Sequence, residues 1–264
     1  MKKLLIAAGF ILSIGLVQAQ QKEGTVLYER VSQVRARFNM NGQENEVNQT
    51  RKENFELTFG NNQSLWKAGE KEPEPESDGG GMRVMMIGNS DNVLYNNFET
   101  GAKVEKREMF DKTFIIDDSI SKTNKWKMTG ETKVILGFPC MKATATTISK
   151  QTRMMMNDGK MERKEVEDTA NIVAWFTTSI PVSAGPAEFQ GQLPGLILEL
   201  NVNNGRQTYT ATAVSAKADI AKIKAPTGKK HYTRDEYKIE SDKMMKQMQE
   251  NMQNGGGGFQ IRRN

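Results

Sequence analysis

Apolar and polar residues alternate along several short stretches of this chain. In Asn54–Phe59 the apolar side chains occupy every second position, which is the period of a strand with one buried face. Asn61 and Asn62 then predict a turn, and Gln63–Lys67 predicts the returning strand. Weaker patterns of the same kind predict further strands at residues 24–29, 92–98, 103–110 and 113–116.

The clearest hairpin signal lies in the last third of the chain. Leu196–Val202 alternates so that its leucines and Val202 share one face, while Ile197 falls on the other. The triplet Asn203–Gly205 contains residues that tolerate positive φ, as tight hairpin turns require. Arg206–Val214 is rich in Thr and predicts the second strand of this hairpin.

A second hairpin is predicted from Met141–Met156 and Lys160–Glu167, with its turn at Asn157–Gly159. Much of this hairpin is polar and has no face to bury in a core. We therefore expect it to project from the body of the protein.

One helix is predicted near the end of the chain. Thr233–Glu236 has the pattern of a capping box, Tyr237–Gln253 contains no Gly or Pro, and Gly255 follows as a stop signal. A narrow apolar stripe runs along this helix at helical spacing. Its members are Tyr237, Met244, Met245, Met248 and Met252.

Strands joined by hairpins and followed by one helix predict a mainly β fold. We expect an antiparallel, curved or partly open β-barrel-like sheet with one C-terminal helix. No shift in composition divides the chain, so residues 20–254 are predicted to form a single β-rich domain. Within it, residues 70–81 combine Glu, Pro and Gly and predict a mobile loop, and residues 255–264 predict a flexible tail.

The first residues show the pattern of a secretory signal. Lys2 and Lys3 precede the apolar run Leu4–Val17, which is shorter than the roughly 18 to 20 residues that a spanning helix needs. Val17 and Ala19 are small enough for the positions that precede a cleavage point. We predict a signal peptide at residues 1–19, export to the periplasm or the exterior, and no transmembrane segment in the mature chain.

Charge and cysteine content exclude two classes of protein. The chain has 37 Lys and Arg against 32 Asp and Glu, and without Lys2 and Lys3 the balance is 35 against 32, or +3. Binding to nucleic acid needs a concentrated basic face, so no nucleic-acid partner is expected. Cys140 is the only cysteine, so an internal disulfide cannot form and stability must come from a packed core.

The segment Ile180–Leu196 is the strongest candidate for a functional loop. Proline restricts φ and glycine permits φ values that other residues avoid, so a segment rich in both is expected to have a defined shape. The residues expected to contact a ligand or partner are Pro186, Phe189, Leu193, Pro194, Gly195 and Leu196. The alternative is a structural crossover that buries Phe189 and Leu193 in the core.

Sixteen methionines are unusual for a chain of 264 residues. Thioether sulfurs suit Cu(I), and Met244, Met248 and Met252 share one face of the predicted helix. These three are the candidate ligands of a soft metal. Packing of the same stripe against the sheet is the alternative, and no cofactor is otherwise implied.

No phosphate-binding loop, nucleophile elbow or HExxH motif is present in the sequence. An enzyme with an unrecognised site would need ionisable residues that converge in a cleft, around Cys140 and His231 or around Glu131 and Lys133. Cys140 has apolar neighbours and is expected to be buried, whereas His231 lies in a polar stretch. Asp117–Asp118 is expected in a loop.

Several segments together resemble one known family. Residues 193–197 read Leu-Pro-Gly-Leu-Ile. The other segments that carry the resemblance are residues 126–144, Ala174–Pro181, Gly185, Pro186 and Phe189, with Tyr28 and Glu29 near the start and residues 228–237 near the end. They resemble the secreted bacterial family GLPGLI, named after the sextet Gly-Leu-Pro-Gly-Leu-Ile.

This chain departs from that sextet at its first position, where Gln192 follows Gly191. If the missing glycine has positive φ in the family, the loop here must differ locally. The resemblance implies an exported, β-rich protein. It brings no activity, substrate or catalytic residue.

These observations predict an exported cell-envelope protein that binds a ligand or a partner without catalysis. The concave face of the sheet is expected to hold an apolar small molecule, in a cavity lined by residues such as Phe55, Phe59, Leu198 and Leu200. An unknown envelope protein is the other partner considered. Two further alternatives are an enzyme with an unrecognised site and copper handling through the methionine clusters.

Overall fold

The computed structural model describes residues 21–40, 43–69, 92–110, 112–122, 124–157 and 160–253. The predicted signal peptide at residues 1–19, the loop at 70–81 and the tail at 255–264 lie outside these residues. Within the described ranges, no helix is both long and apolar enough to cross a membrane.

A single sheet dominates the described part of the chain, with the strand order β12-β6-β5-β4-β3-β2-β1-β11-β10-β9-β8-β7. The strands are β1 (Gly24–Met40), β2 (Gln43–Gly60), β3 (Gln63–Ala68), β4 (Val93–Asn97), β5 (Ala102–Met109), β6 (Lys112–Ser119), β7 (Lys127–Ile135), β8 (Phe138–Asn157), β9 (Lys160–Thr177), β10 (Leu196–Val202), β11 (Gln207–Ser215) and β12 (His231–Thr233). The other elements are the short 3-10 turns η1 (Ala187–Phe189) and η2 (Ile220–Lys222) and the helix α1 (Arg234–Gln253).

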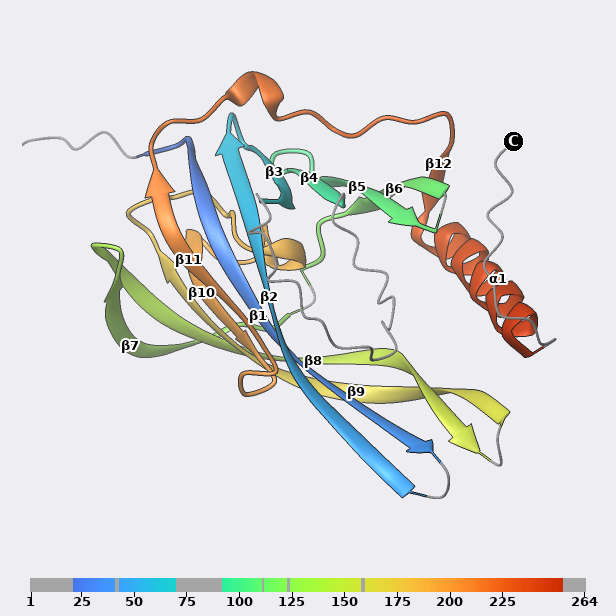
Figure 1. Ribbon diagram of the computed structural model, residues 1–264. Helices are drawn as coiled ribbons and strands as arrows, with labels where there is room; N and C mark the ends of the chain where they lie inside the picture. The colour runs from blue at the N-terminus through green and yellow to red at the C-terminus, as the bar shows by residue number, and fades with distance from the viewer. Residues whose placement is uncertain are drawn as a thin grey trace, which may run out of the picture.

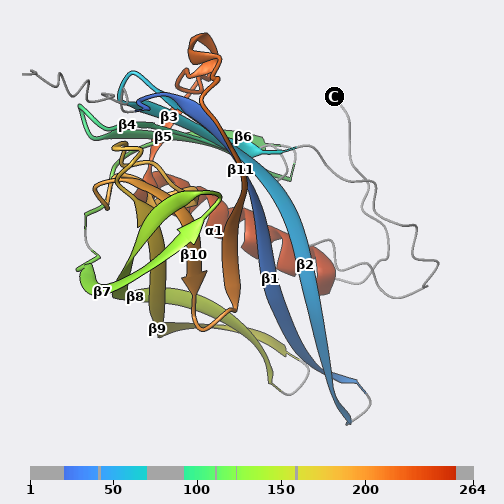
Figure 2. The ribbon, with the colours of Figure 1, turned by 90° about the vertical axis from the view of Figure 1, so that its left-hand side faces the viewer.

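The sheet is curved and open. Strands β7 and β12 form its two edges, and among the described strands the only parallel neighbours are β12 and β6. Figures 1 and 2 show the β3–β6 part curling over the β8–β11 part, with the β9–β10 crossover in between. The predicted fold class, a mainly β protein with an open curved sheet and one C-terminal helix, is confirmed.

The predicted hairpins are present, but two strands are much longer than expected. The pairing of β1 with β2 continues to Met40 and Gln43, far beyond the predicted strands at 24–29 and 54–59. The extension was not predicted because its β2 half, residues 43–53, is polar and shows no alternation, although Val34, Ala36, Phe38 and Met40 alternate with polar residues in the β1 half. The β8–β9 hairpin likewise extends away from the body, as predicted (Figure 1).

The β10–β11 hairpin turns at Asn203, Asn204 and Gly205, whose φ angles are 54°, 54° and 91°. One face assignment in β10 is wrong. Ile197 is as buried as its leucine neighbours, because a bulge shifts the β9–β10 register there and residue 185 of the crossover covers it.

The main core lies on the concave face of the sheet. It is formed by apolar side chains of β1–β3 and β8–β11 together with the crossover between β9 and β10. Phe59, Leu198 and Leu200 are completely buried in it. Tyr28 anchors the crossover side of this core, since its buried hydroxyl donates a 2.5 Å hydrogen bond to the Ile197 carbonyl.

Helix α1 begins at the predicted capping box. The Glu236 carboxylate accepts a 2.7 Å hydrogen bond from the Thr233 N–H, and the Thr233 hydroxyl accepts one from the Glu236 N–H. The helix packs against β6 through Tyr237 and Met244, which form a second, smaller core with Phe114 and other residues. It therefore covers one end of the sheet.

Candidate ligand-binding site

A cavity of about 580 Å³ opens on the concave side of the sheet, beside the main core. Its lining comes from β1–β5, η1, β11 and the first residue of α1. The lining residues are Arg30, Arg51, Glu53, Phe55, Trp66, Asn92, Val93, Leu94, Lys103, Glu105, Arg107, Ala187, Glu188, Gln207, Tyr209 and Arg234. This volume lies within the range of pockets that hold small molecules.

One wall of the cavity is built on β5. Lys103, Glu105 and Arg107 occupy alternate positions of that strand, so their side chains share one face. The Glu105 carboxylate accepts hydrogen bonds from Arg107 and, at 3.2 Å, from Arg234 at the start of α1. Burial lowers the pKa of Arg107, but the Glu105 carboxylate and then Tyr237 together raise it above its ordinary value, so this guanidinium stays charged.

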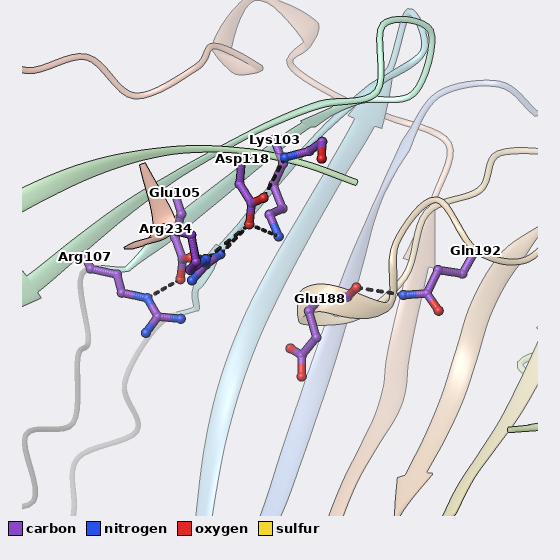
Figure 3. A network of polar contacts seen from close by, with 8 residues as sticks. Lys103, Glu105, Arg107, Asp118, Glu188, Gln192 and Arg234 are labelled. Carbon is purple, nitrogen blue, oxygen red and sulfur yellow. Dashed lines mark hydrogen bonds and ion pairs between the residues drawn. The ribbon is translucent and has the colours of Figure 1, made fainter. Parts of the chain in front are cut away.

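Asp118 on β6 extends this wall. Lys103 lies 2.8 Å from its carboxylate, and Arg234 lies 2.9 Å from it. Burial raises the pKa of Asp118, but hydrogen bonds from Lys103, the Ser119 N–H and Arg234 lower it to about 2. Figure 3 shows these side chains gathered on one face of β5 and β6. The capping box fixes where α1 starts, and this in turn places Arg234 in the network.

The sequence-based placement of Asp117 and Asp118 in a loop is wrong, because both residues lie in β6. Strand geometry sends their side chains to opposite faces. On one face, the Asp117 carboxylate lies 2.8 Å from Nδ1 of His231. On the other face, Asp118 joins the cavity network.

The opposite wall is built on β1 and β2. Arg30 and Glu53 are cross-strand partners and are joined by hydrogen bonds. Arg51, two positions before Glu53 on the same face, lies 3.0 Å from the second carboxylate oxygen. Glu53 therefore joins two guanidinium groups, as Glu105 does on the other wall.

Aromatic rings lie between and beside these walls. Phe55 stacks on Trp66 with 4.9 Å between ring centroids, and the Arg30 guanidinium lies 4.7 Å above Phe55. Tyr209 meets Trp66 edge-on. Burial, and then the nearby Glu188 carboxylate, raise the pKa of Tyr209 to about 12, so its hydroxyl keeps its proton.

The predicted functional loop reaches this cavity through two residues that the sequence did not single out, Ala187 and Glu188. They lie between Pro186 and Phe189 on η1. The loop is held down by a buried 2.6 Å hydrogen bond from Ser64 to Gln190. In Figure 3, Glu188 lies across from the β5 wall.

The loop residues chosen from the sequence are placed mostly in the core. Phe189 and Leu193 are 5% and 3% exposed, which agrees with the structural crossover considered as the alternative. Leu196 begins β10 and is fully buried, Pro186 and Gly195 are buried, and Pro194 is exposed.

The departure from the family sextet has a local explanation. The positive φ, 76°, falls on Gly191, so the residue at 192 needs no glycine. The Gln192 side chain accepts hydrogen bonds from Trp126 Nε1 at 3.0 Å and Asn124 Nδ2 at 2.8 Å. It thereby ties the crossover to the segment before β7. Gly195, by contrast, must lack a side chain, since a Cβ there would lie 2.2 Å from the Thr177 carbonyl oxygen.

The ionisable pairs considered from the sequence lie elsewhere. Cys140, on β8, is 1% exposed in the main core, and burial raises the pKa of its thiol. His231 lies on β12, at the far edge of the sheet order. These two residues therefore do not form a nucleophilic pair.

Glu131 and Lys133 do belong to a charged cluster, but it is built on β7, β8 and β10 and does not line the cavity. Lys142 is 2.8 Å from Glu131, and Lys133 is 2.8 Å from Glu199. Both lysines contact the face of the Trp175 ring. The cluster forms a surface ladder of ion pairs.

Of the candidate metal ligands, Met244 is buried against β6. The side chains of Met248 and Met252 lie outside the described part of the chain. Among the residues that the structure describes, no group of three His, Cys, Asp or Glu side chains is arranged to hold a metal ion.

Comparison with known families covers the middle of the chain. Residues 126–199 match a family model described as a protein of unknown function (Porph_ging). The matched region runs from the start of β7 into β10 and includes the crossover with Leu193–Ile197. No curated protein matches the chain. The cavity walls on β1, β2, β5 and α1 lie outside the matched region.

Sequence patterns contained part of this site. The alternation Lys103, Glu105, Arg107 places three charges on one face of a strand, and Arg51, Glu53 and Phe55 repeat the pattern. A charged face normally points to solvent, so neither pattern by itself indicates a cavity. Only the curl of the sheet brings the two charged faces into one open cavity.

Proposed function

We propose that this protein is an exported, non-enzymatic binding module that holds a small anionic molecule in the concave cavity. One observation carries this proposal: four arginines and a lysine from four separate elements line the same cavity. They are Arg30, Arg51, Lys103, Arg107 and Arg234.

The charge count favours an anion. The lining has five cationic and three anionic side chains, a surplus of two, which Asp118 behind Lys103 and Arg234 reduces to one. Each guanidinium carries five N–H donors, and Glu53 and Glu105 each accept from two guanidiniums through only two oxygens. Donors are thus left for a carboxylate or phosphate, which arginine binds with two parallel hydrogen bonds.

The lining favours a ligand chemistry different from the apolar one expected from the sequence. Phe59, Leu198 and Leu200, the strand residues expected to surround an apolar ligand, are packed in the core, and only Phe55 reaches the cavity. Charged side chains in a site cost free energy when an apolar molecule displaces their water. The cavity therefore fits an anionic ligand with an apolar or flat part better than a purely apolar one.

Export is proposed from the signal sequence at residues 1–19. The Leu193–Ile197 motif supports membership of the GLPGLI family, a proposal that agrees with an envelope location. In the envelope, a module of this kind would retain its ligand or deliver it to another protein. Neither task requires a catalytic group.

Thermal denaturation tests the proposal directly. The mature protein is heated with organic acids and with the matched neutral amides or alcohols. Saturation at about a hundred times Kd adds about 2.7 kcal/mol, or roughly 5–10 °C in Tm for a chain of this size. We expect the acids alone to raise Tm, and added salt to weaken the effect.

Two variants locate the binding. The double variant Arg51→Gln with Arg107→Gln should lose the Tm increase, and Lys222→Gln, whose side chain is 77% exposed and lies outside the cavity, should keep it. Native mass spectrometry of protein purified from its own envelope should show a bound acid. Equal stabilisation by the neutral compounds, or the absence of any stabilising or co-purifying anion, would overturn the proposal.

A second candidate, an enzyme, is favoured by one observation. Glu188 lines the cavity, and no ion pair or hydrogen bond of its carboxylate occurs among the described residues. A free carboxylate beside a bound substrate can act as a general base. Turnover of a bound acid that Glu188→Gln abolishes, with binding unchanged, would favour the enzyme over the binding module.

A further inference from the structure

Four of the five cations of the cavity form two clamps, and Lys103 belongs to neither. The β1–β2 clamp consists of Arg30 and Arg51, joined by Glu53. The β5 clamp consists of Arg107 and Arg234, joined by Glu105. Each clamp is a pair of guanidinium groups on one carboxylate.

The two clamps stand on different parts of the sheet. In the strand order, β4 and β3 separate β5 from β2, so three steps lie between the clamp strands. At about 4.8 Å per step this is roughly 14 Å along the sheet. Trp66 on β3 and Leu94 on β4 line the cavity between them. Both clamps line the same cavity. Figure 2 shows how the sheet curls between the strands that carry them.

Both clamps are held in place without a ligand. Arg30 rests on the ring of Phe55 at 4.7 Å, and Arg107 on the ring of Tyr237 at 5.6 Å. Ring contacts and ion pairs restrict these long side chains, so little rotamer freedom remains to be lost on binding. A site that is preorganised at two separate points is suited to a ligand that engages both points at once.

We propose that the ligand is a two-ended anion, with one carboxylate or phosphate group in the β1–β2 clamp, another in the β5 clamp, and an uncharged apolar part between them. This inference rests on the proposed function and adds the spacing of the charges. A single anionic group engages one clamp and leaves the donors of the other to water. The connecting part lies over Trp66 and Leu94.

Affinity as a function of chain length tests the inference. The mature protein is titrated with linear dicarboxylic acids from succinate to dodecanedioate, and with the monocarboxylic acid of equal length for each. Linking two groups makes the second contact intramolecular, which can strengthen binding by about 10²–10⁴-fold when the linker matches the span. We expect an optimum length at which the diacid binds at least about tenfold more tightly than its monoacid.

Variants of each clamp give a second readout. Arg51→Gln and Arg107→Gln should each reduce the best diacid to the affinity of its monoacid, and the double variant should bind neither. If a glutamine variant fails to fold, Arg51→Lys and Arg107→Lys replace it in the titrations. They keep the positive charge but lack the guanidinium fork, so they should lose the optimum of affinity with chain length. Lys222→Gln should leave the whole series unchanged.

The outcomes separate this inference from the proposed function. Equal affinities of diacids and monoacids at every length would overturn the two-ended ligand and leave an anion-binding module. Failure of every acid to bind would overturn both. A parallel series of bisphosphonates identifies the anionic group, since a phosphate site prefers them to the dicarboxylates at the same optimum length.

Discussion

Replacement of Glu105 by glutamine should lower stability and raise anion affinity at the same time. Glu105 has only 11% of its side-chain surface exposed and joins Arg107 to Arg234. Glu105→Gln preserves the shape of the side chain but leaves two guanidinium groups facing each other. Removal of one partner from a buried ion pair costs about 3–5 kcal/mol.

The expected loss is smaller than that range. Arg107 and Arg234 are 35% and 41% exposed, so water solvates part of their charge, and Arg234 keeps Asp118 as a partner. We expect about 2 kcal/mol, which corresponds to a fall in Tm of about 4–8 °C. Because the β5 clamp loses its internal anion, its affinity for a monocarboxylate should increase.

Urea denaturation followed by circular dichroism measures the free energy of unfolding, and calorimetric titration with a monocarboxylate measures the affinity. Glu108→Gln is the matched control on the same strand. Its ion pair with Lys106 is more exposed and lies outside the cavity, so its loss should stay within about 0.5 kcal/mol. Equal losses in the two variants, or weaker anion binding by Glu105→Gln, would refute the reasoning.

Two further predictions concern stability. Gly195→Ala places a Cβ 2.2 Å from the Thr177 carbonyl oxygen and should lower the free energy of unfolding, measured by urea denaturation, by about 3 kcal/mol. The control Gly101→Ala meets no atom within 4 Å and should lower it by only about 1 kcal/mol, because of its φ of 74°. Equal losses in the two variants would contradict the packing argument. Because the pKa of Asp118 falls from 3.8 to about 2 on folding, its stabilisation is present above pH 4 and is lost between about pH 4 and pH 2. In Asp118→Asn, the free energy of unfolding should change by about 1–2 kcal/mol less between pH 4 and pH 2 than in the unmodified protein, as denaturation at a series of pH values measures. An unchanged pH profile would show that the hydrogen bond from Lys103 does not stabilise the Asp118 carboxylate.

Local signals predicted those elements whose residues carry their own structural preference. The hairpin at residues 196–215 was predicted because Asn203–Gly205 favours positive φ and the flanking leucines alternate. The start of α1 was predicted because Thr233 and Glu236 cap each other. The ribbon extension of β1 and β2 was missed, although Val34, Ala36, Phe38 and Met40 alternate with polar residues, since the paired residues 43–53 follow no period.

The candidate site was predicted only in part. The crossover was correctly singled out, but Phe189 and Leu193, its most prominent residues, pack in the core, while Glu188, just before Phe189, lines the cavity. Burial decides which loop residue is accessible, and burial depends on what the loop is packed against. No pattern within Ile180–Leu196 contains that information.

The sequence by itself determined the β-rich character, the main hairpins, the capped helix and the need for a core without disulfides, because each depends on neighbouring residues or on composition. The tertiary structure alone decided that Arg30, Arg51, Arg107 and Arg234 share one cavity. These residues lie on four elements, of which only β1 and β2 are consecutive in the sequence, and the curl of an open sheet brings them together. Charge pairing across a sheet depends on strand order and register, which long-range packing sets and local propensity does not.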